Sequence, residues 1–157
     1  MTTEMSLRAY RESDAPETFD VCVRAIRQTA SHDYTAQQVE AWSGVDRDLG
    51  VWNRARATAN TQVAQIDGRV VGFTDVDEHG YIDMLFVEPR DVRKGVASAL
   101  LAWAAETARA AGATQLSTHA SITARAFFEA RGFVVDEQRA PIVRGVSLTN
   151  FAMSRQL

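Results

Sequence analysis

Apolar residues near the N-terminus recur at the spacing of a helix. Phe19, Val23 and Ile26 fall on one face, and Asp14 precedes them as a candidate N-cap with Glu17 at the capping-box position. A short strand over residues 6–10 comes before this helix. A second helix is predicted to begin at Thr35, with Gln38 three residues later and Val39 and Trp42 on its inner face, while Trp52 is expected to anchor a third, short helix in the core.

A block with the period of strands follows. Strands are predicted over 61–66, 69–76 and 81–87, and Asp67-Gly68 is a strong hairpin signal between the first two. Residues 77–80 form the next turn, so the block is an antiparallel meander. The chain then becomes rich in Ala and Leu, which predicts a helix over 94–111 closed by Gly112.

The remaining pattern alternates between strand and helix. A strand over 114–119 is expected to run parallel to 81–87 through a right-handed crossover. A helix over 123–133 follows, capped by Thr123 or Ser121, and segments 134–140 and 146–153 end the chain as an antiparallel pair. This order of elements predicts an α/β fold with a mixed sheet flanked by helices.

Composition narrows the class of protein. The chain has 157 residues, 46% of them hydrophobic, and a formal net charge of -3. This suits a single domain over 1–157 and argues against general nucleic-acid binding. The chain shows no signal peptide and no apolar run long enough for a membrane helix, so no membrane association and a cytoplasmic location are expected. The single cysteine, Cys22, is expected to be a buried core thiol.

The stretch from Asp83 to Leu101 reads as a strand, a basic turn and a helix start. Unpaired N–H groups at a helix N-terminus attract anions, and Gly95 lets a ligand approach the backbone. Arg93 and Lys94 add positive charge, and Ser98 adds a hydroxyl donor. The pattern suits a pyrophosphate, although it is neither a Walker A loop nor a G-x-G-x-x-G fingerprint. A solvated basic loop is the alternative reading.

Two motifs in this order resemble the GNAT superfamily of acyl-CoA-dependent N-acetyltransferases. The acyl-CoA motif [QR]-x-x-G-x-[GA] falls on 92–97, and a motif of the form N-x-x-A-x-x-F-Y-E-x-x-G-F falls on 121–133. The resemblance covers nearly the whole chain. It implies a mostly antiparallel central sheet with a splayed parallel pair, acetyl-CoA as cosubstrate and no metal. A homodimer is a further family-level expectation.

The resemblance also assigns positions for acetyl-CoA. The strand 85–87 would bind the pantetheine arm through its main chain, the loop 93–98 would hold the pyrophosphate, and Phe127 and Phe128 would flank the splayed gap. The cofactor-binding residues implied are Leu85, Phe86, Val87, Arg93, Lys94, Gly95, Val96, Ala97, Ser98, Ser121 and Phe128.

This chain departs from the family pattern at two positions. Val92 replaces the usual Gln or Arg, so one polar contact to the cofactor is missing. Phe128 replaces the usual Tyr, whose hydroxyl is often assigned to protonate the leaving thiolate. A thiol titrates near 8.5, so its thiolate is already a fair leaving group.

Attack on a thioester needs a neutral amine, and an alkyl ammonium titrates near 10.4, so a base must accept a proton. Asp83 is one candidate, with Tyr81 on the same face of its strand. His119, at the end of its strand, is the other. An outward-facing Asp and a surface His are the structural alternatives.

The acceptor site of such enzymes is commonly lined by the first two helices and their connecting loop. The substrate-binding candidates are His32, Asp33, Tyr34, Trp42 and Asp75. The carboxylates would attract a cationic amine and the aromatic rings would cover it, although Trp42 also fits a core position. The three histidines and one cysteine have no metal-ligand spacing.

Three functions are compatible with these features. The leading one is transfer of acetyl from acetyl-CoA to a primary amine, on a small molecule or a protein, by direct attack in a ternary complex. A non-catalytic acyl-CoA-binding or sensor module is the second, because Val92 and Phe128 depart from the motifs. A phosphate binder unrelated to CoA is the third, and the missing Walker residues argue against it.

Overall fold

The computed structural model describes residues 4–44 and 46–157. The helices are α1 (Ala15–Arg24), α2 (Ala36–Ser43), α3 (Leu49–Thr58), α4 (Val96–Ala110) and α5 (Ile122–Glu129). The strands are β1 (Met5–Ala9), β2 (Gln62–Ile66), β3 (Arg69–Thr74), β4 (Tyr81–Ile82), β5 (Leu85–Val87), β6 (Gln115–Ser121), β7 (Val134–Arg139), β8 (Ile142–Val143), β9 (Val146–Ser147) and β10 (Asn150–Gln156). The predicted order of elements is confirmed, except that the strand predicted over 81–87 is divided into β4 and β5 and that the hairpin β8–β9 was not predicted.

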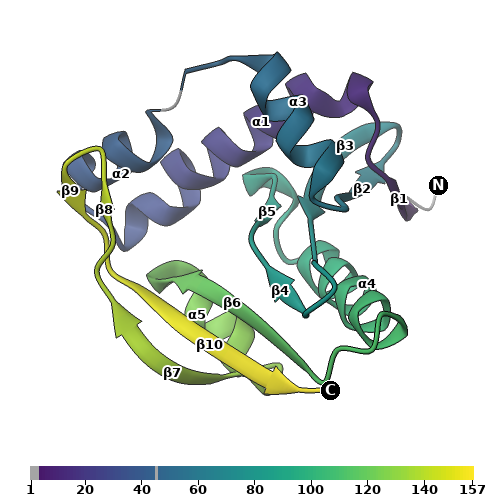
Figure 1. Cartoon of the computed structure of the whole chain (residues 1–157). Helices are drawn as coiled ribbons and strands as arrows, with labels where there is room; N and C mark the ends of the chain where they lie inside the picture. The colour runs from purple at the N-terminus through teal and green to yellow at the C-terminus, as the bar shows by residue number, and fades with distance from the viewer. Residues whose placement is uncertain (1–3, 45) are drawn as a thin grey trace.

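The strands form two four-stranded sheets that diverge from each other (Figure 1). One sheet has the order β1-β2-β3-β5 and is antiparallel, and the other has the order β4-β6-β10-β7. The parallel pairing predicted for the crossover is present between β4 and β6. The mixed, mostly antiparallel fold with a splayed pair is therefore confirmed.

The single strand predicted over 81–87 is wrong, because the chain changes sheets inside it. β4 pairs with β6, β5 pairs with β3, and residues 83 and 84 between them belong to neither strand. The buried carboxylate of Asp75 holds this break. Its Oδ1 accepts the Asp83 backbone N–H at 2.8 Å and the Met84 N–H at 3.4 Å, while Arg56 pairs with its Oδ2 at 3.1 Å. β5 is therefore an edge strand, and no strand among the described residues pairs with its outer edge.

Helix α4 packs closely on the first sheet. Val96, Leu100 and Ala104 on its inner face are 2% exposed or less. A Cβ at Gly72 on β3 would come within 2.9 Å of the Val96 side chain and 3.0 Å of the Phe86 carbonyl oxygen, so only glycine allows this approach. The missing side chain at Gly72 thus allows close helix–sheet packing.

The helix starts agree with the sequence in part. Thr35 caps α2 in a capping box with Gln38, as predicted. Asp14 is the N-cap residue of α1, as predicted, but its carboxylate makes no capping hydrogen bond and instead accepts from the Arg8 guanidinium and the Arg11 backbone N–H. Ser121, rather than Thr123, caps α5 through the Ala124 N–H at 3.0 Å.

The first α-helix changes its winding towards its C-terminal end. α1 continues as a π-helical segment over Ala25–Thr29 and a 3₁₀ turn over Ala30–His32. π-Helical segments are frequent at functional sites because they shift side chains relative to an α-helix. Ala25, Thr29 and Ala30 of this region line the first cavity described below.

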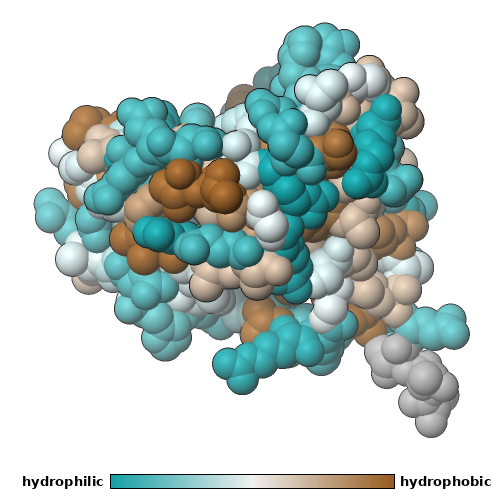
Figure 2. All heavy atoms as spheres, turned by 90° about the horizontal axis from the view of Figure 1, so that it is seen from below, coloured by the Kyte–Doolittle hydropathy of each residue, from teal (hydrophilic) through white to brown (hydrophobic). Residues whose placement is uncertain are grey.

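The C-terminal strand β10 lies between β6 and β7, so β7 is the edge of the second sheet. Charged Asp136, Glu137 and Arg139 lie on β7, which discourages edge-to-edge pairing. Figure 2 shows the molecule from below, with hydrophobic residues in separate groups among hydrophilic ones. No helix within residues 4–44 and 46–157 is long and apolar enough to span a bilayer.

Candidate active site

Two cavities meet where β4 and β5 diverge. The first, the loop cavity, measures about 550 Å³ and is bounded by the loop before α4. The second, the hairpin cavity, measures about 460 Å³ and reaches the hairpin β8–β9. Six residues line both cavities: Trp42, Leu85, Phe86, Ser121, Ala124 and Phe128. A molecule in either cavity can therefore reach the same shared wall.

The loop cavity collects most of the residues predicted to bind acetyl-CoA. Ten of them line it: Leu85, Phe86, Val87, Arg93, Gly95, Val96, Ala97, Ser98, Ser121 and Phe128. Val92 also lines it and is 43% exposed, so an apolar side chain stands where the motif has a polar one. The unpaired edge of β5 runs along this cavity and offers main-chain groups to an extended ligand.

The loop before α4 has the backbone geometry of an anion site. Arg93 and Gly95 adopt left-handed conformations, with φ of 64° and 81°. Left-handed residues in a turn help to gather backbone N–H groups into a concavity. A Cβ built on Gly95 would meet no atom within 4 Å, so the space beside this residue is open to a ligand. The site fits a pyrophosphate at the start of the 15-residue helix α4.

Lys94 is the predicted cofactor residue that the structure places elsewhere. Its Nζ donates to Asp91 Oδ1 at 2.8 Å and it does not line the loop cavity. Asp91 is 1% exposed and also pairs with Arg69. Burial raises the pKa of this carboxyl, but the bonds from Lys94 and Arg69 outweigh it and the net pKa is lowered. Lys94 thus anchors the loop through Asp91.

Arg131 is a cavity residue that sequence reasoning missed. Its guanidinium stacks on the Phe127 ring at 3.9 Å, and it donates to Ser98 Oγ at 2.5 Å and to the Phe127 carbonyl at 3.1 Å. It lies after α5, far in sequence from the basic loop, so no local pattern connected the two. The fold brings a second positive charge to the cavity.

The hairpin cavity contains the three predicted catalytic residues, Tyr81, Asp83 and His119. The Tyr81 hydroxyl lies 3.3 Å from His119 Nδ1, and their rings meet edge to face. Burial, followed by the positive charge of Arg139, lowers the pKa of His119 below its ordinary value. Burial, followed by the charge of Asp83, raises the pKa of Tyr81. The pair therefore holds a neutral imidazole beside a protonated phenol near pH 7.

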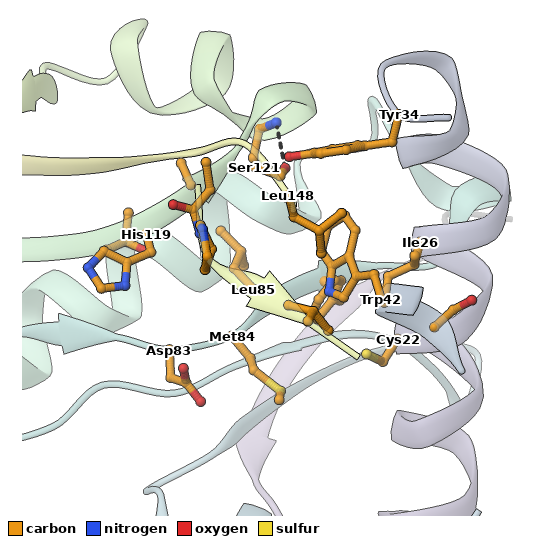
Figure 3. A pocket seen from close by; sticks show the side chains of 18 of the residues that line it. Cys22, Ile26, Tyr34, Trp42, Asp83, Met84, Leu85, His119, Ser121 and Leu148 are labelled. Carbon is orange, nitrogen blue, oxygen red and sulfur yellow. Dashed lines mark hydrogen bonds between the residues drawn. The ribbon is translucent and has the colours of Figure 1, made fainter. Parts of the chain in front are cut away.

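The opposite side of the hairpin cavity is apolar and aromatic. Figure 3 shows His119 and Asp83 on one side and Cys22, Ile26 and Trp42 on the other. Cys22 is buried, as predicted, and burial raises the pKa of its thiol to about 12. Trp42 is half-buried and meets the Tyr34 ring at 5.4 Å. It is thus both a core contact and part of the cavity wall.

Tyr34 joins the two halves of the site. Its hydroxyl donates to the Thr149 carbonyl at 2.6 Å and accepts from the Ile122 N–H at 2.9 Å. It also lines the hairpin cavity. Burial is the main cause that raises the pKa of its phenol. Its hydroxyl is occupied by two protein partners, so it acts as a structural bridge.

Three predicted substrate residues lie outside both cavities. Asp75 is 2% exposed and holds the break between β4 and β5. Asp33 accepts a hydrogen bond from Thr123 Oγ1 at 2.7 Å, and His32 is exposed on the 3₁₀ turn. No cluster of three or more His, Cys, Asp or Glu side chains suited to a metal occurs in the part of the chain that the structure describes.

Comparison with known proteins supplies the family. Residues 30–155 match the family described as acetyltransferase (GNAT) domain. The curated Escherichia coli (strain K12) protein called uncharacterized N-acetyltransferase YafP is 39% identical over 149 residues, covering 95% of this chain and 94% of that protein.

Two solved structures share the fold. A GCN5-related N-acetyltransferase from Rhodopseudomonas palustris, whose description also reads aminotransferase, class-II, has a TM-score of 0.94 at 32% identity and covers 100% of this chain and 99% of its own. The putative acetyltransferase yncA from Salmonella typhimurium, solved with acetyl-CoA, has a TM-score of 0.70 at 22% identity, covering 98% of this chain and 94% of its own.

Proposed function

The chain belongs to the GNAT family of acetyltransferases, and we propose that it transfers acetyl from acetyl-CoA to a primary amine by direct attack in a ternary complex. The observation that carries this proposal is the shared wall at Leu85, Phe86, Ser121 and Phe128. It separates a cavity with an anion-binding loop from a cavity with candidate proton-transfer groups.

The loop cavity suits acetyl-CoA. The left-handed loop at Arg93 and Gly95, the start of α4 and the guanidinium of Arg131 would bind phosphate groups. The free edge of β5 would pair with the extended pantetheine arm. Acetyl-CoA would supply the activated thioester, and these residues would direct its carbonyl towards the shared wall.

The hairpin cavity suits the amine and its proton. Asp83 would attract the ammonium form, and His119 would accept a proton so that the neutral nitrogen can attack. When His119 Nδ1 carries the hydrogen, it donates to the Tyr81 oxygen and leaves Nε2 free to accept. His119 would release that first proton to solvent. The neutral amine nitrogen would then bond to the carbonyl carbon, the C–S bond would break with its electron pair leaving on sulfur, and His119 would accept the second proton, which the attacking nitrogen loses as it becomes an amide.

Ser121 is the group best placed to assist the leaving thiolate, because Phe128 has no hydroxyl. Its Oγ accepts the Ala124 N–H at 3.0 Å, and no hydrogen bond among the described residues uses its own hydrogen. Ser121 lines both cavities. Its hydroxyl would donate to the sulfur as the C–S bond breaks.

We extend the proposal to the domain extent, the cellular location and the oligomeric state of the enzyme. One N-acetyltransferase domain over 1–157, a cytoplasmic location and a homodimer would agree with the family and with a chain that has one cysteine. Light scattering of the purified protein would test the dimer. A monomer at tens of micromolar would contradict that part.

The test of the activity is release of free CoA thiol. Protein and acetyl-CoA are mixed with a panel of primary amines, and the thiol is detected with and without each amine. Amine-dependent release that is lost in Asp83→Asn and His119→Ala would support acetyl transfer. Tight acetyl-CoA binding without release on any amine would instead support the non-catalytic module.

A further inference from the structure

The hairpin cavity divides into a polar end and an apolar bay. Tyr81, Asp83 and His119 form the polar end. Figure 3 shows the labelled bay residues Cys22, Ile26 and Trp42 on the side away from His119. We define the aromatic bay as Phe19, Cys22, Ile26, Trp42, Trp52 and Phe86, all of which line the cavity. The division means that one molecule in the cavity meets two different chemical environments.

The polar atoms of the aromatic bay are neutral or already paired. The Trp52 indole N–H donates to Thr18 Oγ1 at 2.9 Å. Cys22 stays uncharged because burial raises the pKa of its thiol to about 12. Ser43 at its edge donates to the Val39 carbonyl at 2.7 Å. A charged group placed here would lose its hydration without gaining a partner.

The rings of the bay already pack as aromatic clusters do. Phe19 meets Trp52 edge to face at 5.3 Å, and Trp42 lies 6.4 Å from Phe86 in a tilted arrangement. A further ring in the cavity would continue this packing, since edge-to-face and offset contacts favour aromatic partners. The hairpin cavity has a volume of about 460 Å³, which suits a small molecule.

The hairpin β8–β9 walls this cavity and is fastened to α2. Arg144 Nη1 donates to the Ala41 carbonyl at 2.7 Å, and Gln38 Nε2 donates to the Ser147 carbonyl at 3.1 Å. Tyr34 adds its bond to Thr149 at 2.6 Å just after the hairpin. A long peptide lying across the site would have to break these bonds, whereas a compact acceptor would not.

From this arrangement we infer that the acceptor is a primary amine on a compact, uncharged, ring-sized apolar body. The amine lies at the polar end, and the body fills the aromatic bay. This inference rests on the proposed function. Among the described lining residues Asp83 is the one carboxylate, so the cavity matches a single positive charge, and polyamines or lysine-bearing peptides are poor acceptors.

The first test compares acceptors at a fixed acetyl-CoA concentration. 2-Phenylethylamine and tryptamine are set against spermidine and a short lysine-containing peptide, with thiol release giving kcat/KM for each. We expect the aryl amines to exceed the other two by about tenfold or more, the advantage that about 1.4 kcal/mol gives. Equal or better use of spermidine or the peptide would overturn the inference while leaving acetyl transfer intact.

Calorimetry separates failure of the inference from failure of the proposed function. 2-Phenylethylamine is titrated into the protein saturated with CoA. If 2-phenylethylamine binds but no amine causes thiol release, the inferred ligand class is supported and the proposed acetyl transfer is refuted. If the aryl amines show no binding and no turnover, the inference is refuted, whatever the other amines do.

A matched pair of variants locates the ligand. Val23 is half-buried on α1 and lines the hairpin cavity, whereas Val134 on β7 is 61% exposed and lines neither cavity. Val23→Phe should fill the bay and raise the KM for 2-phenylethylamine about tenfold, with the Kd for acetyl-CoA unchanged. Val134→Phe should change neither. An unchanged KM in folded Val23→Phe would contradict a ligand body in this bay.

Discussion

The carboxylate of Asp75 holds the backbone of Asp83, with 2.8 Å between Oδ1 and the amide nitrogen. The same side chain is ion-paired with Arg56, and both side chains are 5% exposed or less. Burial raises the pKa of Asp75, opposed by the bond from Asp83 and by the charge of Arg56. An acidic residue predicted to meet the substrate thus shapes the break that separates the two sheets.

Asp75→Ala should destabilise the fold by about 3–5 kcal/mol, because it leaves a buried guanidinium and two backbone amides without their acceptor. Urea unfolding measures the change. Asp83→Asn is the control, since this side chain is exposed and its backbone bond is retained, and it should stay within about 0.5 kcal/mol. Equal stability of Asp75→Ala and the parent would show that Asp75 does not hold the break.

His119→Ala should lower kcat by about 10²–10⁴-fold, the usual contribution of a positioned base. Because the pKa of His119 is lowered, the imidazole is neutral at pH 6.5 and above, and kcat should fall only as pH drops below that value. The variant should lose this acid limb in a kcat–pH profile. Asp83→Asn should mainly raise the KM for the amine. If the acid limb of the kcat–pH profile is lost in Asp83→Asn and kept in His119→Ala, Asp83 is the base.

Gly95→Ala should weaken acetyl-CoA binding about tenfold or more, because the added Cβ projects into the open space beside the loop. The left-handed backbone also costs roughly 1–2 kcal/mol in stability. Gly68→Ala is the matched control, since Gly68 has φ of 75°, has equally open surroundings and lies in the β2–β3 turn. It should lose similar stability with an unchanged Kd in calorimetry; the same loss of affinity in both variants would refute the loop assignment.

Arg131→Ala should raise the Kd for acetyl-CoA by about 10- to 100-fold, as expected for loss of a charged hydrogen-bond donor worth about 1.5–3 kcal/mol. The dependence of Kd on salt should also weaken, because one positive charge leaves the cavity. Arg109→Ala on the exposed side of α4 is the control and should bind normally. An unchanged Kd for acetyl-CoA in Arg131→Ala would mean that this guanidinium contacts only Ser98 and Phe127 and does not bind the ligand.

Ser121→Ala should lower kcat about tenfold through loss of the donor to the thiolate, besides about 1 kcal/mol of stability from the lost helix cap. Phe128→Tyr introduces a hydroxyl at the same wall of the two cavities. In the double variant the kcat loss should shrink while the stability loss persists. Single-turnover kinetics on the folded proteins measures the loss in kcat. If Phe128→Tyr does not reduce the loss caused by Ser121→Ala, a proton donor at this wall is contradicted.

Local patterns were sufficient for much of the molecule. The capping box at Thr35 and the turn at Asp67-Gly68 each depend on residues close in the chain, and the structure reproduces them. Eight of the ten predicted residues that line the loop cavity lie within residues 85–98, which are consecutive along one strand, loop and helix, and the other two, Ser121 and Phe128, lie in the second motif.

Tertiary structure decided what depends on distant partners. The apolar run 81–87 reads as one strand, but the buried carboxylate of Asp75 and the two pairings with β3 and β6 divide it. Arg131 reaches Ser98 across 33 residues, and the hairpin β8–β9 reaches α2 across more than 100. The sequence by itself thus determined the family and was sufficient to predict the acetyl-CoA positions, because both depend on motifs of residues that are close in the chain. The hairpin cavity was decided by packing between elements far apart in the chain, where burial and long-range hydrogen bonds select the contacts.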